Sequence, residues 1–246
     1  MEINILQNET ELLGFPVIKL SDWGSAKDII AYEENIIGDY QSAYVYCQVT
    51  ATDLESIHLL ENKGYQFSEF RIHSMLKTDD VEVNTRSFFP YKAALIGDEE
   101  ELDCAIKMLQ KIKQDDRFSR DPLIESTFST NRNIANLRKS FLNFNSEFLL
   151  GMFNSQTDEL LAFRSGGYLS KHEAHYYQYA VSPNYDFAQM AEMLEAFTIE
   201  FLKQKGISII HTISTGFNIS ELNRMITSHE FVIISNYLLL RKLFHK

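Results

Sequence analysis

The chain has 246 residues, of which 45% are hydrophobic, so it is long and apolar enough for one large or two smaller globular domains. Its net charge of −11 and pI near 5.1 argue against nucleic acid binding, which draws on clustered Lys and Arg. Apolar runs too short to span a bilayer and an acidic N-terminus unlike a secretory signal predict no membrane contact and a cytoplasmic location.

The first third of the chain alternates strand-like and helix-like stretches, which is typical of an α/β layer. Thr52 or Asp53 can cap the second helix, and Gly64 can end it. The turn-rich run from Leu76 to Pro90 marks a boundary, so we expect an N-terminal α/β lobe over residues 1–90. Its expected elements are strands at Phe15–Leu20, Ser42–Val49 and Gln66–Leu76, and helices near Ala26–Ile36 and Asp53–Lys63.

Residues 91–246 are expected to form a second domain of the same mixed class. Asp115–Ile124 is predicted as a charged loop, with Pro122 at the first position of the following helix. Two apolar runs around a polar turn, Phe148–Phe153 and Leu160–Gly166, predict a hairpin. The remaining expected strands are Tyr91–Ile96, His175–Val181, Ile207–Ile213 and Phe231–Leu240, and the helices are Glu99–Ile112, Leu123–Leu142, Phe187 to a stop at Gly206, and Ile219–Thr227 with Asn218 as its cap.

The stretch His175–Gly206 is central, because a strand, a turn at Pro183 and a long amphipathic helix follow one another directly. A strand that runs into a helix N-terminus brings backbone N–H groups and the positive end of the helix dipole together. The unit therefore predicts either an anion site or an ordinary βα unit of a core.

An internal similarity joins the two halves. Placing Asp53 on Asn218 superimposes two capped helices, aligns Gly64 with His229, and leaves SEFRIHSMLK and ISNYLLLRK as terminal strands of nearly equal length. Both halves could follow one plan, although two ordinary αβ units would match nearly as well.

Several stretches in this order resemble the GNAT (GCN5-related N-acetyltransferase) superfamily, in particular its two-lobed members that act on sugar nucleotides. The resemblance covers nearly the whole chain and implies a GNAT-like mixed sheet flanked by helices, with a smaller N-terminal lobe. The stretches are ETELLGFPVIKL (Glu9–Leu20), DRFSRDPLI (Asp116–Ile124), AVSPNYD (Ala180–Asp186) and NISELNRMITSHEFVIISNYLLLR (Asn218–Arg241).

The resemblance implies an acyl-CoA-dependent N-acyltransferase that moves an acetyl group from acetyl-CoA to the amine of a small molecule, such as an amino sugar. The cofactor would lie where the strand His175–Val181 splays from the strand Ile207–Ile213. Backbone of Tyr179, Ala180 and Val181 would pair with the pantetheine arm, and Asn218, which is equally explained as a helix cap, would touch it. The first turn of the next helix would receive the pyrophosphate, through Phe187, Ala188, Gln189, Met190 and Ala191.

Three residues depart from the family's pattern. Asp186 stands where the family has Arg or Gln, and Gln189 stands at the central glycine of the phosphate loop. Met225 replaces a tyrosine that protonates the leaving thiolate, and a thioether has no proton to donate. The chain could therefore bind acyl-CoA by another geometry, or be a catalytically silent binding or interaction protein with a degenerate CoA site.

If the reaction is retained, a base must deprotonate the acceptor ammonium. Alternation places His175, Tyr177 and Tyr179 on one face of their strand, so His175 and Tyr177 are the predicted catalytic residues. A histidine exposed beside a turn is the alternative for His175. Arg117 and Asp121 could reach the acceptor or form a surface ion pair.

The two cysteines, Cys47 and Cys104, have no CxxC spacing and no histidine at ligand distance, so we expect structural thiols and no metal site. The 18 Phe and 12 Tyr could serve an acceptor pocket or the contact of a homodimer. An ordinary α/β protein that matches the superfamily by coincidence is a third alternative.

Overall fold

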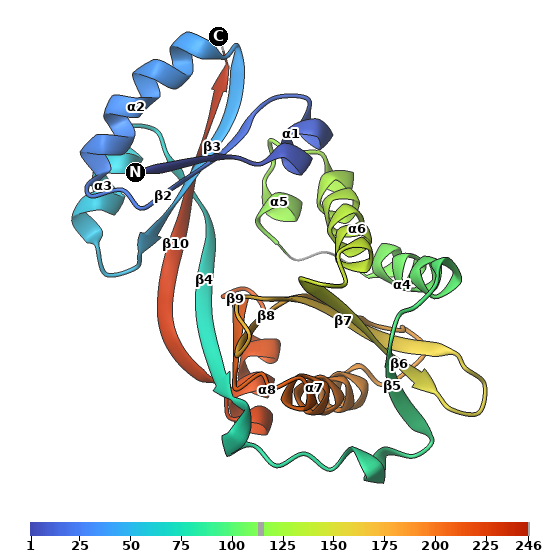
Figure 1. The fold of residues 1–246 in the computed structure, drawn as a ribbon. Coiled ribbons are helices and arrows are strands. Elements are labelled where there is room, and N and C mark those ends of the chain that lie inside the picture. Colours follow the sequence, from blue (N-terminus) through green and yellow to red (C-terminus); the bar gives the residue numbers. More distant parts are fainter. Residues whose placement is uncertain (113–115, 246) are drawn as a thin grey trace.

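The computed structural model describes residues 1–112 and 116–245, and its strands form one mixed sheet in the order β1-β2-β3-β10-β4-β9-β8-β7-β6-β5 (Figure 1). The mixed α/β class expected from the sequence is confirmed. The strands are β1 Glu2–Ile5, β2 Val17–Ser21, β3 Ser42–Thr50, β4 Gln66–Lys77, β5 Tyr91–Leu95, β6 Glu147–Asn154, β7 Leu160–Tyr168, β8 Glu173–Val181, β9 Ile209–Thr215 and β10 Val232–His245. The helices are α1 Gln7–Leu13, α2 Ala26–Asp39, α3 Leu54–Asn62, α4 Glu99–Lys111, α5 Arg117–Arg120, α6 Ser126–Leu142, α7 Phe187–Gln204 and α8 Ile219–His229, with short 3-10 turns at Thr78–Asp80 and Thr85–Phe88.

Most expected elements lie within a few residues of their predicted bounds, but three short ones were not predicted. These are β1, α1 and α5, which is a single capped turn inside the stretch expected as a charged loop. The first residue of that stretch, Asp115, lies outside the described residues. The position expected for Pro122 is wrong: it lies in the connection between α5 and α6, and α6 begins four residues later at Ser126.

The two halves of the sheet share one connectivity, which supports the predicted duplication. In each half an antiparallel pair (β1/β2 or β7/β8) leads to a parallel pair (β2/β3 or β8/β9) joined by a helix, α2 or α7. A second helix, α3 or α8, then leads to a long final strand. The caps correspond as expected, since Asp53 accepts from Ser56 N–H and Asn218 from Glu221 N–H.

The final strand of each half crosses into the other half. β10 pairs with the whole length of β3, and β4 pairs with β9, while β4 and β10 pair with each other at the centre (Figure 1). The proposed division at residue 90 therefore separates two stretches of chain that share one sheet.

Buried charges hold this crossing in place. Arg241 of β10 binds both carboxylate oxygens of Asp121 at 2.7 and 3.0 Å, and the Tyr44 hydroxyl donates to the same carboxylate. Arg117 is 3% exposed and stacks on the rings of Tyr46 and Phe118. The prediction of a surface ion pair between Arg117 and Asp121 is therefore wrong, because both are buried and Asp121 binds Arg241.

Helices cover both faces of the sheet in each lobe. In the N-terminal lobe α2 and α3 pack on one face, and α5 with the start of α6 pack on the other. In the C-terminal lobe α7 packs below the sheet in Figure 1 together with α8, and α4 and α6 pack above it. Among the described residues, no helix combines the length and the apolar character needed to cross a bilayer.

Because the lobes share strands, we expect the chain to unfold in one cooperative step. Leu194→Ala in α7 removes a fully buried side chain and should lower the free energy of unfolding by about 2–5 kcal/mol. Trp23, the single tryptophan, packs in the other lobe, so its fluorescence reports on the unfolding of that lobe. In Leu194→Ala the urea midpoint measured by this fluorescence should fall together with the midpoint measured by circular dichroism.

Leu142→Ala, whose side chain is 70% exposed, is the matched control and should leave both midpoints in place. A Trp23 midpoint that stays unchanged in Leu194→Ala while the dichroism transition splits would show that the lobes unfold independently.

Candidate functional site

The two parallel strands β8 and β9 separate part-way along their length and leave a cleft. They pair only over Glu173↔Ile209, Ala174↔Ile210 and His175↔His211, after which both continue without pairing to each other. The opening holds a cavity of about 310 Å³. Its walls come mainly from β8 and β9, with residues of β7, α6, α7 and α8 and of the ends of α4 and α5. The lining residues are Ile112, Asp116, Asn133, Arg164, Tyr176, Tyr177, Gln178, Tyr179, Ala180, Phe187, Thr212, Ile213, Ser214, Thr215, Asn218, Glu221 and Met225.

A β-bulge shapes the β8 wall of this cleft. Gln178 pairs with Ser165 and Tyr176 pairs with Gly166, so Tyr177 is an extra residue with no partner on β7. The bulge turns Tyr176 and Tyr179 to the same side, where both rings stack on the Arg164 guanidinium at 4.3 and 4.8 Å. The expectation that Tyr179 shares a face with His175 is wrong, because simple alternation fails across a bulge.

Tyr177 lies over a glycine of the neighbouring strand. A Cβ at Gly167 would come within 2.2 Å of the Tyr177 hydroxyl, so a side chain at this position would displace the Tyr177 ring. Tyr177 remains 50% exposed and lines the cleft. The structure therefore brings this predicted catalytic residue to the cavity.

A buried cluster of charges forms the floor of the cleft, on the side of α7 and α8. Arg164 of β7 binds Glu195 of α7 at 2.7 Å, and both side chains are almost fully buried. Arg224 of α8 lies 3.5 Å from the same Glu195 oxygen and binds both oxygens of Glu221 at 2.8 and 3.0 Å. The Tyr179 hydroxyl donates to Glu221 at 2.7 Å and so joins β8 to α8.

The protonation states in this cluster follow from these contacts. Burial and the neighbouring Glu221 carboxylate raise the pKa of Tyr179, so its hydroxyl keeps its proton. Burial acts to raise the pKa of Glu221, but the Arg224 hydrogen bonds and charge outweigh it and the pKa is lowered. The cluster thus pairs two arginine side chains with two carboxyl side chains.

This cluster was not predicted, although the sequence contains one sign of it. Glu195 interrupts the apolar face of α7 between Leu194 and Ala196, and Arg164 interrupts the apolar strand β7. A charge inside a buried segment needs a partner of opposite sign, so these two positions could have been paired from the sequence.

His175 lies at the closed end of the cleft and does not line the cavity. It is the last residue of β8 that pairs with β9, and its partner His211 contacts His73 of β4 with 3.2 Å between ring nitrogens. Burial, then His73 and His211, lower the pKa of His175 to about 4. His175 is therefore neutral at pH 7, and its catalytic role stays a prediction.

The start of α7 is a regular capped turn. Asp186 accepts a hydrogen bond from Gln189 N–H at 2.8 Å, so a carboxylate of the chain already occupies the helix N-terminus. Phe187 is half exposed and lines the cleft, Ala188 and Gln189 are exposed, and Met190 and Ala191 are buried against the sheet.

The start of α8 faces the same cavity. Asn218 caps the helix through Glu221 N–H at 3.2 Å and also lines the cleft, so its two predicted roles are compatible. Met225 is 2% exposed, and its sulfur lies 3.6 Å from the Ser214 hydroxyl. It packs between β9 and α8, as expected of a methionine at this position.

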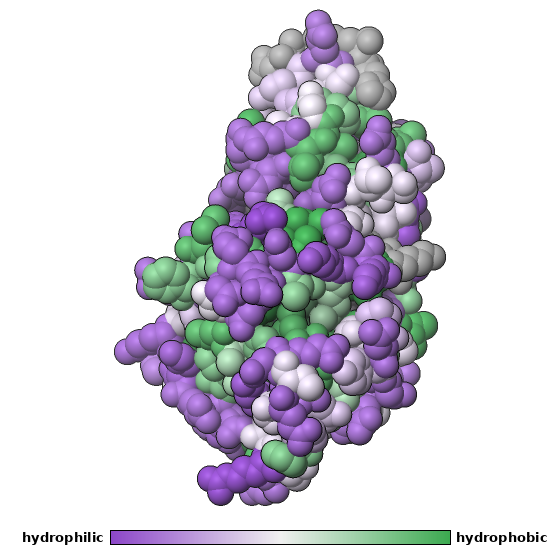
Figure 2. All heavy atoms as spheres, turned by 90° about the vertical axis from the view of Figure 1, so that its right-hand side faces the viewer, coloured by the Kyte–Doolittle hydropathy of each residue, from purple (hydrophilic) through white to green (hydrophobic). Residues whose placement is uncertain are grey.

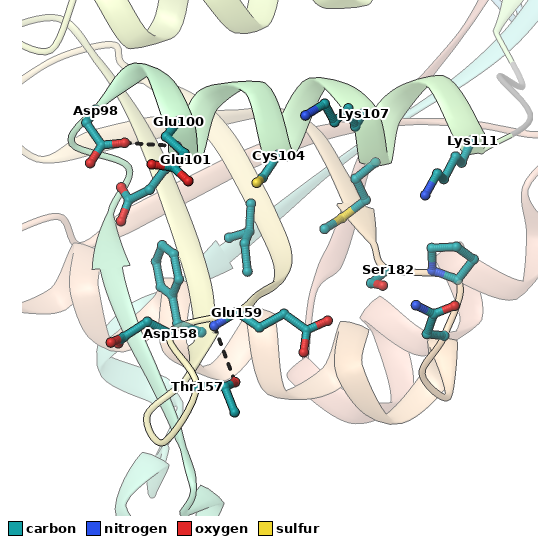
Figure 3. Close-up of a pocket in the computed structure, with 15 residues that line it drawn as sticks. Asp98, Glu100, Glu101, Cys104, Lys107, Lys111, Thr157, Asp158, Glu159 and Ser182 are labelled. Carbon is teal, nitrogen blue, oxygen red and sulfur yellow. Dashed lines mark hydrogen bonds between the residues drawn. The ribbon is translucent and has the colours of Figure 1, made fainter.

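A second, larger hollow of about 580 Å³ lies between α4, the β6–β7 turn and the segment after β8 (Figure 3). Figure 3 shows Asp98, Glu100 and Glu101 at one end of α4 and Lys107 and Lys111 towards the other. Figure 2 views the molecule from this side and shows green apolar residues among purple hydrophilic ones. We take the smaller cleft as the candidate site, because it has unpaired strand edges and a buried polar floor.

Solved structures resemble this chain over nearly its whole length. A GCN5-related N-acetyltransferase from Sphaerobacter thermophilus matches with a TM-score of 0.66 and 12% identity, over 99% of this chain and 76% of that one. A tandem GNAT protein from the clavulanic acid biosynthesis pathway matches with a TM-score of 0.58 and 11% identity, over 92% and 75%. The chain has the GNAT fold. A GCN5-related N-acetyltransferase from Kribbella flavida also matches, with a TM-score of 0.60 and 10% identity, over 92% of this chain and 81% of that one.

No family model matches the sequence, and no curated protein matches it either. The likeness is therefore one of fold at low identity, and it confirms the GNAT-like mixed sheet expected above. The order of stretches along the sequence predicted this fold, and the helices and strands of the structure follow the same order as those of the GNAT-fold structures.

The GNAT-fold cleft suits one part of coenzyme A and not another. The edge of β8 that faces β9 is free of strand pairing beyond His175, which suits the amide groups of a pantetheine arm. The first turn of α7 does not suit a diphosphate, because Asp186 already accepts from one of its N–H groups, that of Gln189, and adds a negative charge.

The ion pair on the cleft floor gives a test of stability. Glu195→Ala leaves Arg164 buried without its 2.7 Å partner and should lower the free energy of unfolding by about 3–5 kcal/mol in urea titrations. The exposed pair Lys92–Asp158 is the control, and Asp158→Ala should change stability by less than about 1 kcal/mol. Arg164→Met with Glu195→Met should recover much of the loss, and a double variant as unstable as Glu195→Ala would contradict this account.

His175 gives a test of pH dependence. Its pKa is lowered from 6.5 to about 4, so between these values the unfolded chain binds a proton that the folded chain does not. Its contribution to stability is therefore present above pH 6.5 and is lost as the pH falls towards 4. Between pH 7 and pH 4.5 the urea midpoint of His175→Asn should fall by less than that of the wild type. His58→Asn, a change at an exposed site, is the control, and its midpoint should fall by as much as that of the wild type.

Proposed function

We propose that this chain is an N-acyltransferase that holds a pantetheine thioester, as in acetyl-CoA, in the β8/β9 cleft and transfers its acyl group to a small-molecule amine. One observation carries the proposal. The parallel strands part after His175↔His211 and leave a strand edge open beside a cavity. An extended ligand with amide groups can pair with such an edge as an added strand does.

The residues expected to hold the donor surround this edge. Backbone of Tyr179, Ala180 and Val181 is proposed to pair with the pantetheine amides, and Asn218 lies across the cleft on α8. The acceptor is proposed to enter from the other side of the sheet, where Asn133 and Asp116 line the cavity. A carboxylate at Asp116 suits a cationic amine, and an amino sugar is one member of that class.

The reaction needs a base for the acceptor ammonium. Once its proton is removed, the nitrogen forms a bond to the thioester carbon, the carbon–sulfur bond breaks, and the thiolate takes a proton. Tyr177 lines the cavity, whereas His175 lies outside it with its ring 5.8 Å from that of Tyr177. We propose Tyr177 as the catalytic residue that meets the acceptor and His175, which is neutral at pH 7, as a catalytic partner that acts through Tyr177. Met225 has no proton for the thiolate, so the donor is proposed to be solvent or a hydroxyl that lines the cavity, such as that of Tyr177 or Ser214.

A second candidate function is a binding or interaction protein without transfer activity. It is favoured by the Asp186 cap at the start of α7 and by Met225 at the position of the family's proton donor. Such a protein would bind a ligand in the cleft and release no thiol.

Binding and turnover distinguish the two candidates. We expect acetyl-CoA at millimolar concentration to raise the melting temperature and give heat in calorimetry, because a ligand above its dissociation constant stabilises the folded state. Thiol release with a panel of amines should follow, and Tyr177→Phe and His175→Ala should each lower it by tenfold or more.

Leu142→Ala, far from the cleft in sequence and exposed, is the control and should release thiol at the wild-type rate. Binding without thiol release from any amine would favour the second candidate. Absence of binding by every thioester tested would overturn the proposal.

A further inference from the structure

The outer end of the cleft, between the first turns of α7 and α8, is apolar. We call this end the cleft exit and define it by Phe187 and Ile219. Phe187 is 52% exposed and Ile219 is 63% exposed, so two large apolar side chains meet solvent there. The Phe187 ring lies 6.1 Å from that of Tyr179, which continues the apolar surface inwards.

The charges near the cleft exit do not favour an anion. Asp186, directly before Phe187, is exposed and accepts from Gln189 N–H, so it both fills the helix N-terminus and repels negative groups. Of the residues that line the cleft, Arg164 is the one cation in the described part of the chain, and Glu195 binds it. Arg224 is bound to Glu221.

A further cation, Arg120 of α5, lies near the start of α8. Its guanidinium lies 4.2 Å from the centre of the Phe217 ring, and Phe217 packs against Phe67 of β4. Phe217 directly precedes Asn218, so Arg120 stacks on a ring beside α8 and not at the first turn of α7.

The inner part of the cleft has the opposite character. The open edge of β8 offers backbone N–H and C=O groups, and Asn218 and Ser214 add polar side chains. A neutral chain with amide groups suits this part, while a doubly charged diphosphate suits neither the apolar exit nor the Asp186 cap.

We propose that the cleft recognises its donor by the acyl-pantetheine part alone and gains no affinity from the nucleoside diphosphate of coenzyme A. The donor class is therefore the neutral thioesters of pantetheine, of which acyl-CoA is one member among others. This inference rests on the proposed function, because it assumes that the β8/β9 cleft binds a thioester.

Calorimetry with three probes tests the inference. Acetyl-CoA and acetyl-pantetheine should bind the wild-type chain with dissociation constants within fivefold of each other, and adenosine 3′,5′-bisphosphate should give no heat. Asp186→Asn keeps the side-chain cap and removes its charge, so it should tighten acetyl-CoA binding by a few-fold and leave acetyl-pantetheine unchanged. Raising the salt concentration should not weaken acetyl-CoA binding to the wild type.

The outcomes separate the inference from the function it rests on. Acetyl-CoA binding more than fivefold tighter than acetyl-pantetheine would overturn the inference and leave the proposed function standing. Heat from the bisphosphate alone would overturn it as well. If neither thioester gives heat or a thermal shift, the proposed function fails, and the inference fails with it.

Discussion

The parting of β8 from β9 is the constraint on which the site depends. Parallel pairing stops at His175↔His211, and the bulge at Tyr177 lies two residues further along β8. The bulge turns two tyrosines towards α7 and α8, where they hold Arg164 between their rings. Arg164 then ties β7 to α7 through Glu195, and Tyr179 ties β8 to α8 through Glu221. One local irregularity in a strand therefore places four elements around the cavity.

The two halves of the chain share a connectivity, but only the second half opens its parallel pair. In the first half β2 and β3 stay paired through Leu20↔Cys47, one residue before β2 ends. The outer face of that pair is covered by Phe118 of α5 and Phe128 of α6. The two halves thus share a connectivity, but only the C-terminal half has a cleft between its parallel strands. In the N-terminal half the corresponding face of the sheet is covered by the segment that contains α5 and the start of α6.

Local signals in the sequence predicted local structure well. Asp53 and Asn218 were expected as helix caps, and both caps form, because capping depends on residues three positions apart. The final strands β4 and β10 were predicted, but their exchange between the lobes was not. The sequence of a strand does not show which distant strand it pairs with. The bulge at Tyr177 was missed for a related reason: alternation continues in the sequence through a residue that the sheet leaves unpaired.

The candidate site was predicted in part. The cleft between the two strands was expected from the resemblance, and the structure contains it beside Tyr179, Phe187 and Asn218. Its charged floor was not expected, because Glu195 and Arg164 are 31 residues apart and acquire meaning only once paired. Asp121 and Arg117 were expected at the surface, but hydrophilic side chains can be buried when partners from distant strands are present, as Arg241 is for Asp121.

The position of β10 also bears on how the chain reaches this fold during synthesis. β4 is complete once residue 77 has been made, yet its neighbour in the sheet ends at residue 245. At about 5–20 residues per second, a ribosome needs roughly 10–30 s to supply that missing strand. Until β10 has been made, the edges of β3 and β4 that it pairs with in the folded chain lack that partner. A growing chain in this state exposes edges that pair readily with other strands, so its yield in a cell would depend on how long translation takes and on which chaperones cover those edges.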